Sequence, residues 1–300
     1  MAEQVKLAAE NSVSIVGRLV DVEVKTGVDK GNKEYVSIKA SVVSSLQGKD
    51  NIFKIDAFTY RLTQDKKESN LYKQYVELPN SKGKKVQVSG SLKETRIWGK
   101  NKQQMVSFSS ISGRFFSVVP EVTLDLATFI MSGFVVKSIE EKKNKAGEIY
   151  RYDFSIGQQN YKGDNMSVFG FNIQPTNVEL REGVGSWKVG DTVRIQGDLM
   201  SVEETTVVED KKGGFGAPIT KTYTNTISGF YITGGSNPFT IEEGAYPSEV
   251  IANLIAAYKA KDATIAAAAK NAAESSTSTV AATAVQGAAA PVTSRQTSLI

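Results

Sequence analysis

Two stretches that share one pattern decide the fold: GKKVQVSGSL at residues 83–92 and GDTVRIQGDL at residues 190–199. Both fit G-x-x-V-x-[VI]-x-G-x-L without a gap, so apolar residues alternate with polar ones until a glycine interrupts the run. Alternation with period two is typical of a half-buried β-strand. A glycine inside such a strand marks a bulge or a tight bend. The two stretches therefore predict the same curved strand in two copies.

Two further matches flank these strands, in the same order in both halves of the chain. Upstream, SIVGRLVDVEV around Gly17 parallels FIMSGFVVKSIE around Gly133. Downstream, SISGRFF around Gly113 parallels TISGFYI around Gly229. Repetition in a fixed order indicates a repeated structural unit. The sequence therefore predicts two copies of one fold rather than a set of generic amphipathic strands.

Each copy contains five runs that are expected to form strands. They lie near residues 12–25, 33–44, 51–60, 84–97 and 103–117, and near residues 129–141, 148–160, 164–173, 191–206 and 219–233. The polar stretch 61–79 is expected to be partly helical. Five strands with a long connection between the third and the fourth describe an OB-fold. We therefore expect an all-β protein of two tandem five-stranded OB-fold barrels.

Charge is distributed unevenly between the two copies. Residues 1–119 hold 20 Lys/Arg against 12 Asp/Glu, a net charge of +8, whereas residues 120–245 hold 12 against 17, a net charge of −5. Clustered positive charge favours a polyanionic partner. The first segment is therefore predicted to be a basic OB-fold domain that meets a polyanion. The second is predicted to be an acidic OB-fold domain suited to dimerisation or partner contact.

The C-terminal part of the chain differs from both barrels. Residues 246–274 are predicted to form a short helix, which docks on a barrel or on another subunit. Its apolar stripe consists of Val250, Ile251, Leu254, Ile255 and Tyr258. Residues 275–300 are rich in Ala, Ser and Thr, cannot bury a core, and are expected to be a disordered tail.

The composition argues against most catalytic sites. The chain has no cysteine and no histidine, which removes thiolate nucleophiles, the commonest metal ligand and the commonest general base. No Asp/Glu cluster has the spacing of an EF-hand loop, and there is no P-loop pattern. We therefore expect no catalytic residues, no metal and no cofactor, and predict that the protein is not an enzyme.

The sequence also bears on location. No uninterrupted apolar run approaches the roughly 18 residues that span a membrane. The opening MAEQVKLAAEN lacks a basic region followed by an apolar run, unlike a secretory signal. We therefore expect a cytoplasmic protein with no membrane partner.

Alternation along the second and third runs turns a set of rings and cations away from the core. The residues at the alternate positions, which include Phe53 and Ile55, face inward. These two strands form the usual ligand surface of an OB barrel. The predicted platform has Tyr35, Phe58 and Tyr60 as base-stacking residues, and Lys39, Lys54 and Arg61 as phosphate contacts. The alternative is that these rings cover the barrel end or pack against the second domain.

The segment between the fourth and fifth runs supplies a second candidate set. Trp98 has the parity of the expected core residue Leu92, so only a bulge or an extended hairpin would expose it. A strand end flanked by four cations makes a poor core, which favours a ligand-facing Trp98. The loop between these strands commonly closes over ligand in OB-folds. The predicted phosphate contacts here are Lys93, Arg96, Lys100 and Lys102, with Glu94 the single acidic residue among them.

The second barrel offers fewer candidates. Phe169 and Phe171 either face outward or belong to the core, and Trp187 is interpreted as structural. Phe215 is a lone aromatic residue in the glycine-rich loop KKGGFGAP, where little local packing is expected. It is interpreted as a stacking finger for a base or as a protein contact.

Several stretches resemble one family, the bacterial-type single-stranded DNA-binding proteins. GKKVQVSGSLKETRIWGKNKQ resembles that family's fourth-strand hairpin, SVSIVGRLVDVEV its first strand, and NIFKIDAFTYRL its third. The likeness covers most of residues 12–117, more weakly residues 129–233, and not the tail. By this resemblance, Trp98 and Phe58 occupy the positions of base-stacking residues. The resemblance also implies a role in DNA replication, recombination or repair, alongside proteins of those processes.

The chain departs from the family pattern in two ways. The tail ends Ser298-Leu299-Ile300 without acidic residues, so the family's usual recruitment of partner enzymes through an acidic tip is not implied. The commonest members carry one barrel and form tetramers, whereas two barrels predict a monomer or a homodimer. Such a divergent version would suit a phage or another mobile element, acting in the host cytoplasm.

Three interpretations follow from these observations. The first is a protein that binds single-stranded DNA without sequence preference, through base stacking and Lys/Arg contacts to phosphates. The alternative is a non-catalytic tandem-OB structural or adaptor protein in a larger assembly, including a phage assembly. A third is RNA binding, although nothing in the sequence reads a 2′-hydroxyl. The fold alone does not decide, because OB-folds host many ligands.

Overall fold

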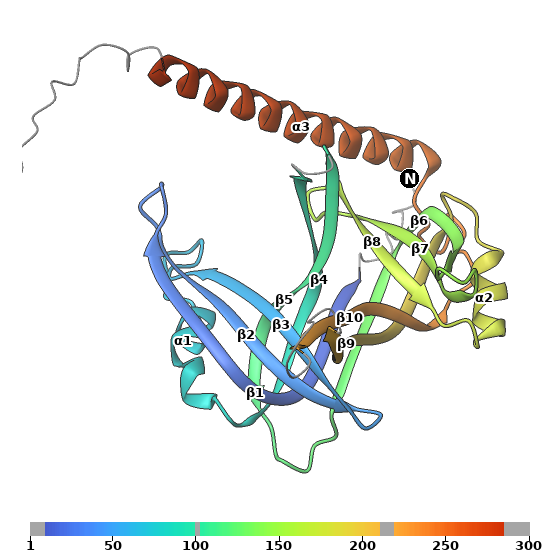
Figure 1. Cartoon of the computed structure of the whole chain (residues 1–300), viewed down its shortest axis with the longest axis horizontal. Helices are drawn as coiled ribbons and strands as arrows, with labels where there is room; N and C mark the ends of the chain where they lie inside the picture. The colour runs from blue at the N-terminus through green and yellow to red at the C-terminus, as the bar shows by residue number, and fades with distance from the viewer. Residues whose placement is uncertain (1–9, 100–102, 211–218, 285–300) are drawn as a thin grey trace, which may run out of the picture. The chain divides into compact units, whose positions relative to one another are not determined.

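A computed structural model describes residues 10–99, 103–210 and 219–284 of the chain (Figure 1). The first barrel contains β1 (Asn11–Val28), β2 (Glu34–Leu46), β3 (Lys49–Tyr60), α1 (Asn70–Glu77), a 3₁₀ turn (Leu78–Ser81), β4 (Lys85–Gly99) and β5 (Gln104–Val118). The second contains β6 (Leu126–Lys143), β7 (Ile149–Gln159), β8 (Met166–Ile173), α2 (Val178–Gly185), β9 (Thr192–Asp210) and β10 (Ile219–Gly235). The helix α3 (Ser248–Ala284) follows.

Each set of five strands is connected by the same pairings. In the first, β1 runs antiparallel to β2 and β4, β2 to β3, and β3 pairs in parallel with β5 at Ile55 and Ile111. In the second, β6 runs antiparallel to β7 and β9, β7 to β8, and β8 pairs in parallel with β10 at Asn172 and Tyr231. A helix lies between the third and fourth strands of each set. The prediction of two tandem OB-folds is confirmed.

The glycines of the quoted repeat lie where two backbones approach each other. A Cβ atom on Gly90 would lie 2.1 Å from the carbonyl oxygen of Ser112 on β5. A Cβ atom on Gly197 would lie 2.1 Å from the carbonyl oxygen of Tyr231 on β10. No side chain fits at such distances, so glycine is what allows the strands to close on each other at this point of both barrels.

The second pair of repeated glycines does the same on β1 and β6. A Cβ atom would lie 2.3 Å from the carbonyl oxygen of Val43 if built on Gly17, and 2.4 Å from that of Gly157 if built on Gly133. Shortly after each of these glycines the register with the neighbouring strand shifts. Such a bulge bends a strand and increases its twist. The sequence repeat is therefore a repeat of barrel corners.

The two barrels share one sheet and one core. The strands β1 and β6 pair from Asn11 and Met131 to Val16 and Leu126. A single continuous cluster of buried residues spans both barrels and includes Ile15, Ile38, Val88, Phe129, Phe154 and Phe171. The barrels are therefore fixed to each other by backbone hydrogen bonds and apolar packing, rather than strung on a flexible linker.

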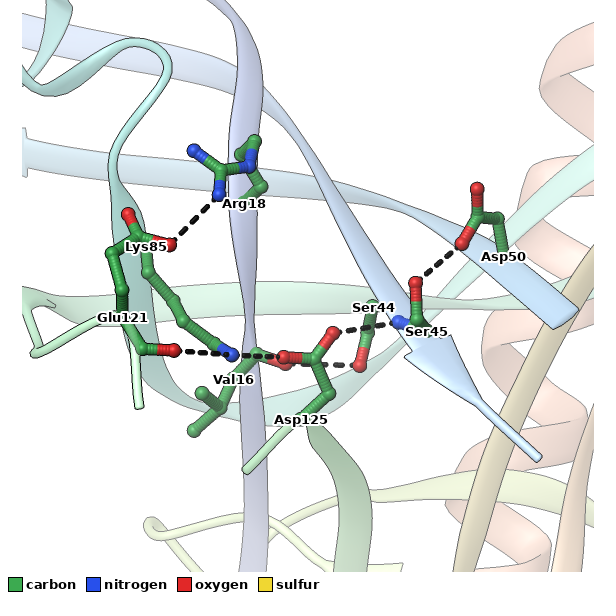
Figure 2. A network of polar contacts seen from close by, with 8 residues as sticks. All are labelled: Val16, Arg18, Ser44, Ser45, Asp50, Lys85, Glu121 and Asp125. Atoms are coloured by element: carbon green, nitrogen blue, oxygen red, sulfur yellow. Dashed lines mark hydrogen bonds and ion pairs between the residues drawn. The ribbon is translucent and has the colours of Figure 1, made fainter. Parts of the chain in front are cut away.

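The connection between β5 and β6 is also attached to the first barrel, as Figure 2 shows. The carboxylate of Asp125 accepts a hydrogen bond from the backbone N–H of Ser45 at 2.7 Å and forms an ion pair with Lys85. The side chains of Lys85 and Asp125 are only 14% and 19% exposed, so water screens this pair less than a surface pair. Nearby, Arg18 donates to the carboxylate of Glu121 at 2.8 Å.

The predicted stripe of the C-terminal helix packs on the second barrel. Ile251 and Leu254 are buried together with Phe134 and Met166, which confirms docking on a barrel. The helix continues to Ala284, whereas the sequence predicted an end near residue 274 and disorder from residue 275. The alanine-rich stretch before that point is a strong helix former and favours continuation. Residues 285–300 lie outside the described residues.

By its contacts the chain forms two compact units. One contains both barrels and α3 as far as Tyr258. The other contains the tip of the β4–β5 hairpin, from Arg96 to Val106, and α3 after Tyr258. Within the described ranges, no helix combines the length and the apolarity needed to cross a membrane.

We expect Gly90→Ala and Gly197→Ala each to lower the free energy of unfolding by about 3 kcal/mol, because the new methyl group overpacks against a backbone carbonyl. Urea unfolding measures this. Gly170→Ala on β8 is the matched control, since a Cβ atom there meets nothing within 4 Å, and its effect should stay below about 1 kcal/mol. Equal losses in all three variants would contradict the close-approach explanation.

Candidate nucleic-acid interface

Three aromatic rings come together on the face of β2 and β3 that points away from the core. Tyr35 is the cross-strand partner of Tyr60, and Phe58 lies on the same face. The ring centroids of Tyr35 and Phe58 are 5.4 Å apart with 31° between the planes. Those of Phe58 and Tyr60 are 5.1 Å apart, edge to face. We call these three residues the aromatic shelf.

The aromatic shelf is open to solvent. Phe58 is 53% exposed and Tyr60 is 38% exposed, whereas Tyr35 is half-buried. Phe53 and Ile55, at the opposite parity of β3, are buried in the core, as the alternation predicted. An exposed cluster of rings on a regular strand has no packing role of its own and is typical of a binding surface. The alternative that Phe58 is covered by the second barrel is not what the structure shows.

The loop between β1 and β2 fixes the position of Tyr60. The Tyr60 hydroxyl donates to the carboxylate of Asp29 at 3.1 Å, and that carboxylate also accepts from the backbone N–H groups of Gly31 and Lys33. The Lys33 ammonium lies 5.9 Å from the centroid of the Tyr60 ring. The hydrogen bond to Asp29 raises the pKa of Tyr60. The backbone N–H of Lys33 is the main cause that lowers the pKa of Asp29.

The predicted cations on this face differ in their surroundings. Lys39 and Lys54 are exposed, and neither forms an ion pair with a residue that the structure describes. Asp56 lies opposite Lys39 across the strands, so the face is mixed in charge. Arg61 pairs with Glu34 at 2.7 Å and with Glu68 at 3.5 Å, a partnership that sequence reasoning missed. Lys33 is the additional cation beside the shelf that the sequence reasoning did not select.

The base of the β4–β5 hairpin is held by Glu94, the one acid among its cations. The Glu94 carboxylate accepts from the backbone N–H of Val168 on β8 at 3.0 Å and from the hydroxyl of Ser107 on β5 at 2.8 Å. It also accepts from the hydroxyl of Tyr258 on α3. Glu94 therefore connects β4 to the second barrel and to the part of α3 that ends at Tyr258. The sequence feature that could have indicated this role is that Glu94 is a single carboxylate in a basic segment.

The hairpin is extended, as exposure of Trp98 requires, but α3 contacts the two residues predicted to meet ligand. Arg96 donates to the carboxylate of Asp262 at 2.7 Å, and only 7% of its side chain is exposed. The Lys270 ammonium lies 5.9 Å from the Trp98 ring centroid, and Trp98 is half-buried. The sequence predicted ligand contacts for Trp98 and Arg96 and did not predict these contacts with α3. Strand parity describes the hairpin alone, whereas the helix comes from a distant part of the sequence.

The remaining candidates divide into three groups. Lys93 is exposed on β4. Lys100, Lys102 and Phe215 lie outside the described residues, so their roles stay predictions.

In the second barrel, Phe169 and Phe171 are 1% and 0% exposed and therefore belong to the core rather than to the outer face. Trp187 packs edge to face on Phe154. Among the residues placed in the structure, no group of three or more acidic side chains could hold a metal ion.

We expect Asp29→Asn to lower the pKa of Tyr60 toward its ordinary value, because the variant removes the negative acceptor that disfavours loss of the phenolic proton. Ultraviolet difference titration of the variant against the wild type detects the tyrosinate that appears earlier. Asp21→Asn is the control, since it removes the same charge from a carboxylate that pairs with Lys82. Identical titrations for the wild type and Asp29→Asn would show that this hydrogen bond does not hold Tyr60.

Comparisons with known proteins agree with this architecture. A deletion mutant of the single-stranded DNA-binding protein from Thermus aquaticus has a TM-score of 0.50 and 13% identity, covering 81% of this chain and 100% of that one. The wild-type Thermus protein has a TM-score of 0.48 and 14% identity, covering 77% and 94%. No curated protein matches the chain. Residues 9–271 match the YorF family, and because this match spans most of the chain, the protein belongs to the YorF family.

Proposed function

We propose that this protein binds single-stranded DNA without sequence preference and carries out no catalysis. The observation that carries the proposal is the aromatic shelf of Tyr35, Phe58 and Tyr60, open to solvent beside lysines on a regular strand pair. Stacking on rings tolerates any sequence, because every base has a π-face. The sequence resemblance and the likeness in fold to a protein named for binding single-stranded DNA support the same function.

On this face the rings would bind bases and the lysines would bind phosphates. Bases stack on Phe58 and Tyr60, and each stacked base contributes about 1–3 kcal/mol. Lys33, Lys39 and Lys54 meet phosphates along the path. Since Asp56 lies among these lysines, stacking supplies the larger share of the binding energy on the shelf itself. Lys93 and the predicted Lys100 and Lys102 would add phosphate contacts at the hairpin.

Within the hairpin tip, Arg96 and Trp98 would bind DNA only when they leave α3. Asp262 already neutralises Arg96, and Lys270 lies against Trp98. A phosphate at Arg96 and a base on Trp98 would therefore replace these contacts with the helix. Binding to the hairpin and contact with α3 are, in this proposal, mutually exclusive.

The setting of the function is proposed from the same resemblance. The protein would act in the cytoplasm, as a monomer or homodimer, in DNA replication, recombination or repair. A phage or another mobile element remains the proposed source. These assignments rest on the sequence, and the binding chemistry does not depend on them.

We expect Phe58→Ala to weaken binding to fluorescent oligo-dT by about 5- to 150-fold, which corresponds to the loss of one stacked base. Tyr161→Ala is the matched control, because Tyr161 is 93% exposed beside Lys162 and lies in the connection between β7 and β8 of the second barrel. Affinity should also fall with salt, as phosphate contacts release counterions. Wild-type protein that fails to bind oligo-dT at low salt would overturn the proposal, and tighter binding to oligo-rU would redirect it to RNA.

We expect Asp262→Asn to strengthen oligo-dT binding severalfold, because the variant removes a carboxylate that competes with phosphate for Arg96. Glu249→Gln in the first turn of α3 removes the same charge from the same helix without touching the hairpin, and should leave affinity unchanged. Fluorescence titration of both variants makes the comparison. Unchanged or weaker binding by Asp262→Asn would show that α3 does not compete with the nucleic acid.

A further inference from the structure

A groove of about 660 Å³ lies between the two barrels. Strands β3 and β5 line it from the first barrel, and β7 to β10 line it from the second, with Tyr258 at the start of α3. The two barrels belong to one compact unit with a shared core, so the walls of this groove hold their positions. Its volume is in the range of small-ligand sites, which run from about 300 to 1,000 Å³.

The chemistry of the lining selects a flat, neutral ligand. Among the lining residues that the structure describes, Lys54 is the only charged one, so this part of the groove offers little to a phosphate cluster, a carboxylate or a metal ion. Phe108 on β5 and Phe230 on β10 supply aromatic faces, and Met200 adds a polarisable apolar surface. Hydroxyls, which both donate and accept hydrogen bonds, come from Ser109, Ser110, Ser155, Ser201 and Ser228. Ser107 also lines the groove, but its hydroxyl donates to Glu94 and is left as an acceptor.

The two rings differ in how firmly they are held. Phe230 contacts Phe129 and Phe171, with ring centroids 6.1 Å and 6.2 Å away, and is therefore anchored in the second barrel's core. Phe108 is 47% exposed and is free to meet a ligand. Gly170, on the β8 wall, is exposed, and a Cβ atom there would meet nothing within 4 Å, so open space remains beside it.

The groove continues the proposed binding path. Lys54 lines the groove and stands on the same face of β3 as Phe58. Four residues of strand separate them, which is about 13 Å. A strand stacked on Phe58 that follows this face toward Lys54 would therefore reach the mouth of the groove.

We propose that this groove is a second base-binding site, in which nucleobases of the strand held by the aromatic shelf insert next to Phe108. The inference rests on the proposed function and extends it, because it gives the second barrel a direct part in binding. The bases lie between the barrels and the phosphates stay outside, where Lys54 meets the backbone at the entrance. Serine hydroxyls satisfy the edges of any base, so the site has no need of sequence preference.

The chain provides a matched pair of variants to test this. Phe108 and Phe115 lie on the same strand, β5, and each is 47% exposed. Phe108 lines the groove, whereas Phe115 does not and has Arg114 over its ring at 5.3 Å. Both alanine variants therefore remove one equally exposed ring from one strand.

The measurement is fluorescence titration with oligo-dT of increasing length. The shortest oligomer whose affinity falls in Phe58→Ala is taken to contact the aromatic shelf alone. Longer oligomers extend from the shelf into the groove. We expect Phe108→Ala to weaken binding of the longer oligomers by about 5- to 150-fold. Its affinity for the shortest oligomer should equal that of the wild type. Phe115→Ala should change neither affinity. Gly170→Leu, which fills the groove without altering Phe108, should produce the same selective loss.

The outcomes separate the two proposals. Suppose that the wild type binds and Phe58→Ala weakens binding, but Phe108→Ala and Gly170→Leu do not change the affinity for oligomers of any length. The groove is then not a base-binding site, and the proposal for the aromatic shelf is supported. Equal losses for Phe108→Ala and Phe115→Ala would likewise overturn the groove, since surface apolarity alone would explain them. If the wild type binds no oligomer, the proposed function itself fails.

Discussion

Close contact between backbones at four glycines is the constraint on which the rest of this structure depends. At Gly17 and Gly90 in the first barrel, and at Gly133 and Gly197 in the second, a strand passes against a carbonyl oxygen with no room for a side chain. These crossings let short sheets curl into barrels. The crossing at Gly17 brings β1 against β2, and the outer face of β2 carries Tyr35 of the candidate site.

Most of the fold could be predicted from the sequence because the signals are local. Strand alternation depends on neighbouring residues, so YVSIKASV and NIFKIDAF identified their core and solvent faces directly. The exposed positions of Phe58 and Tyr60 followed from the same parity. The repeat then fixed the architecture, because a second copy in the same order repeats the first copy's topology.

What the sequence could not provide are contacts between distant segments. Nothing in the hairpin indicates that Asp262 and Lys270 would lie against Arg96 and Trp98. The parity of Phe169 and Phe171 allowed either face, and only the packing of both barrels into one core decided it. Tertiary contacts of this kind carry no periodicity, which is why reasoning from local patterns ends there.

The charge balance was a coarser guide than the ring pattern. The first half of the chain carries a net charge of +8, yet on the described face Asp56 faces Lys39 and Arg61 is paired with Glu34. Net charge therefore describes attraction at a distance. The rings, by contrast, specify where on the surface a ligand would be held.

The pairing of β1 with β6 has a consequence for the edge of the first barrel. The segment from Val13 to Val16 lies between β4 on one side and β6 on the other. Without β6, that segment would be an open sheet edge, which readily pairs with a strand from another molecule. In this chain β6 pairs with the edge instead, so the second barrel protects the first from strand addition at this point.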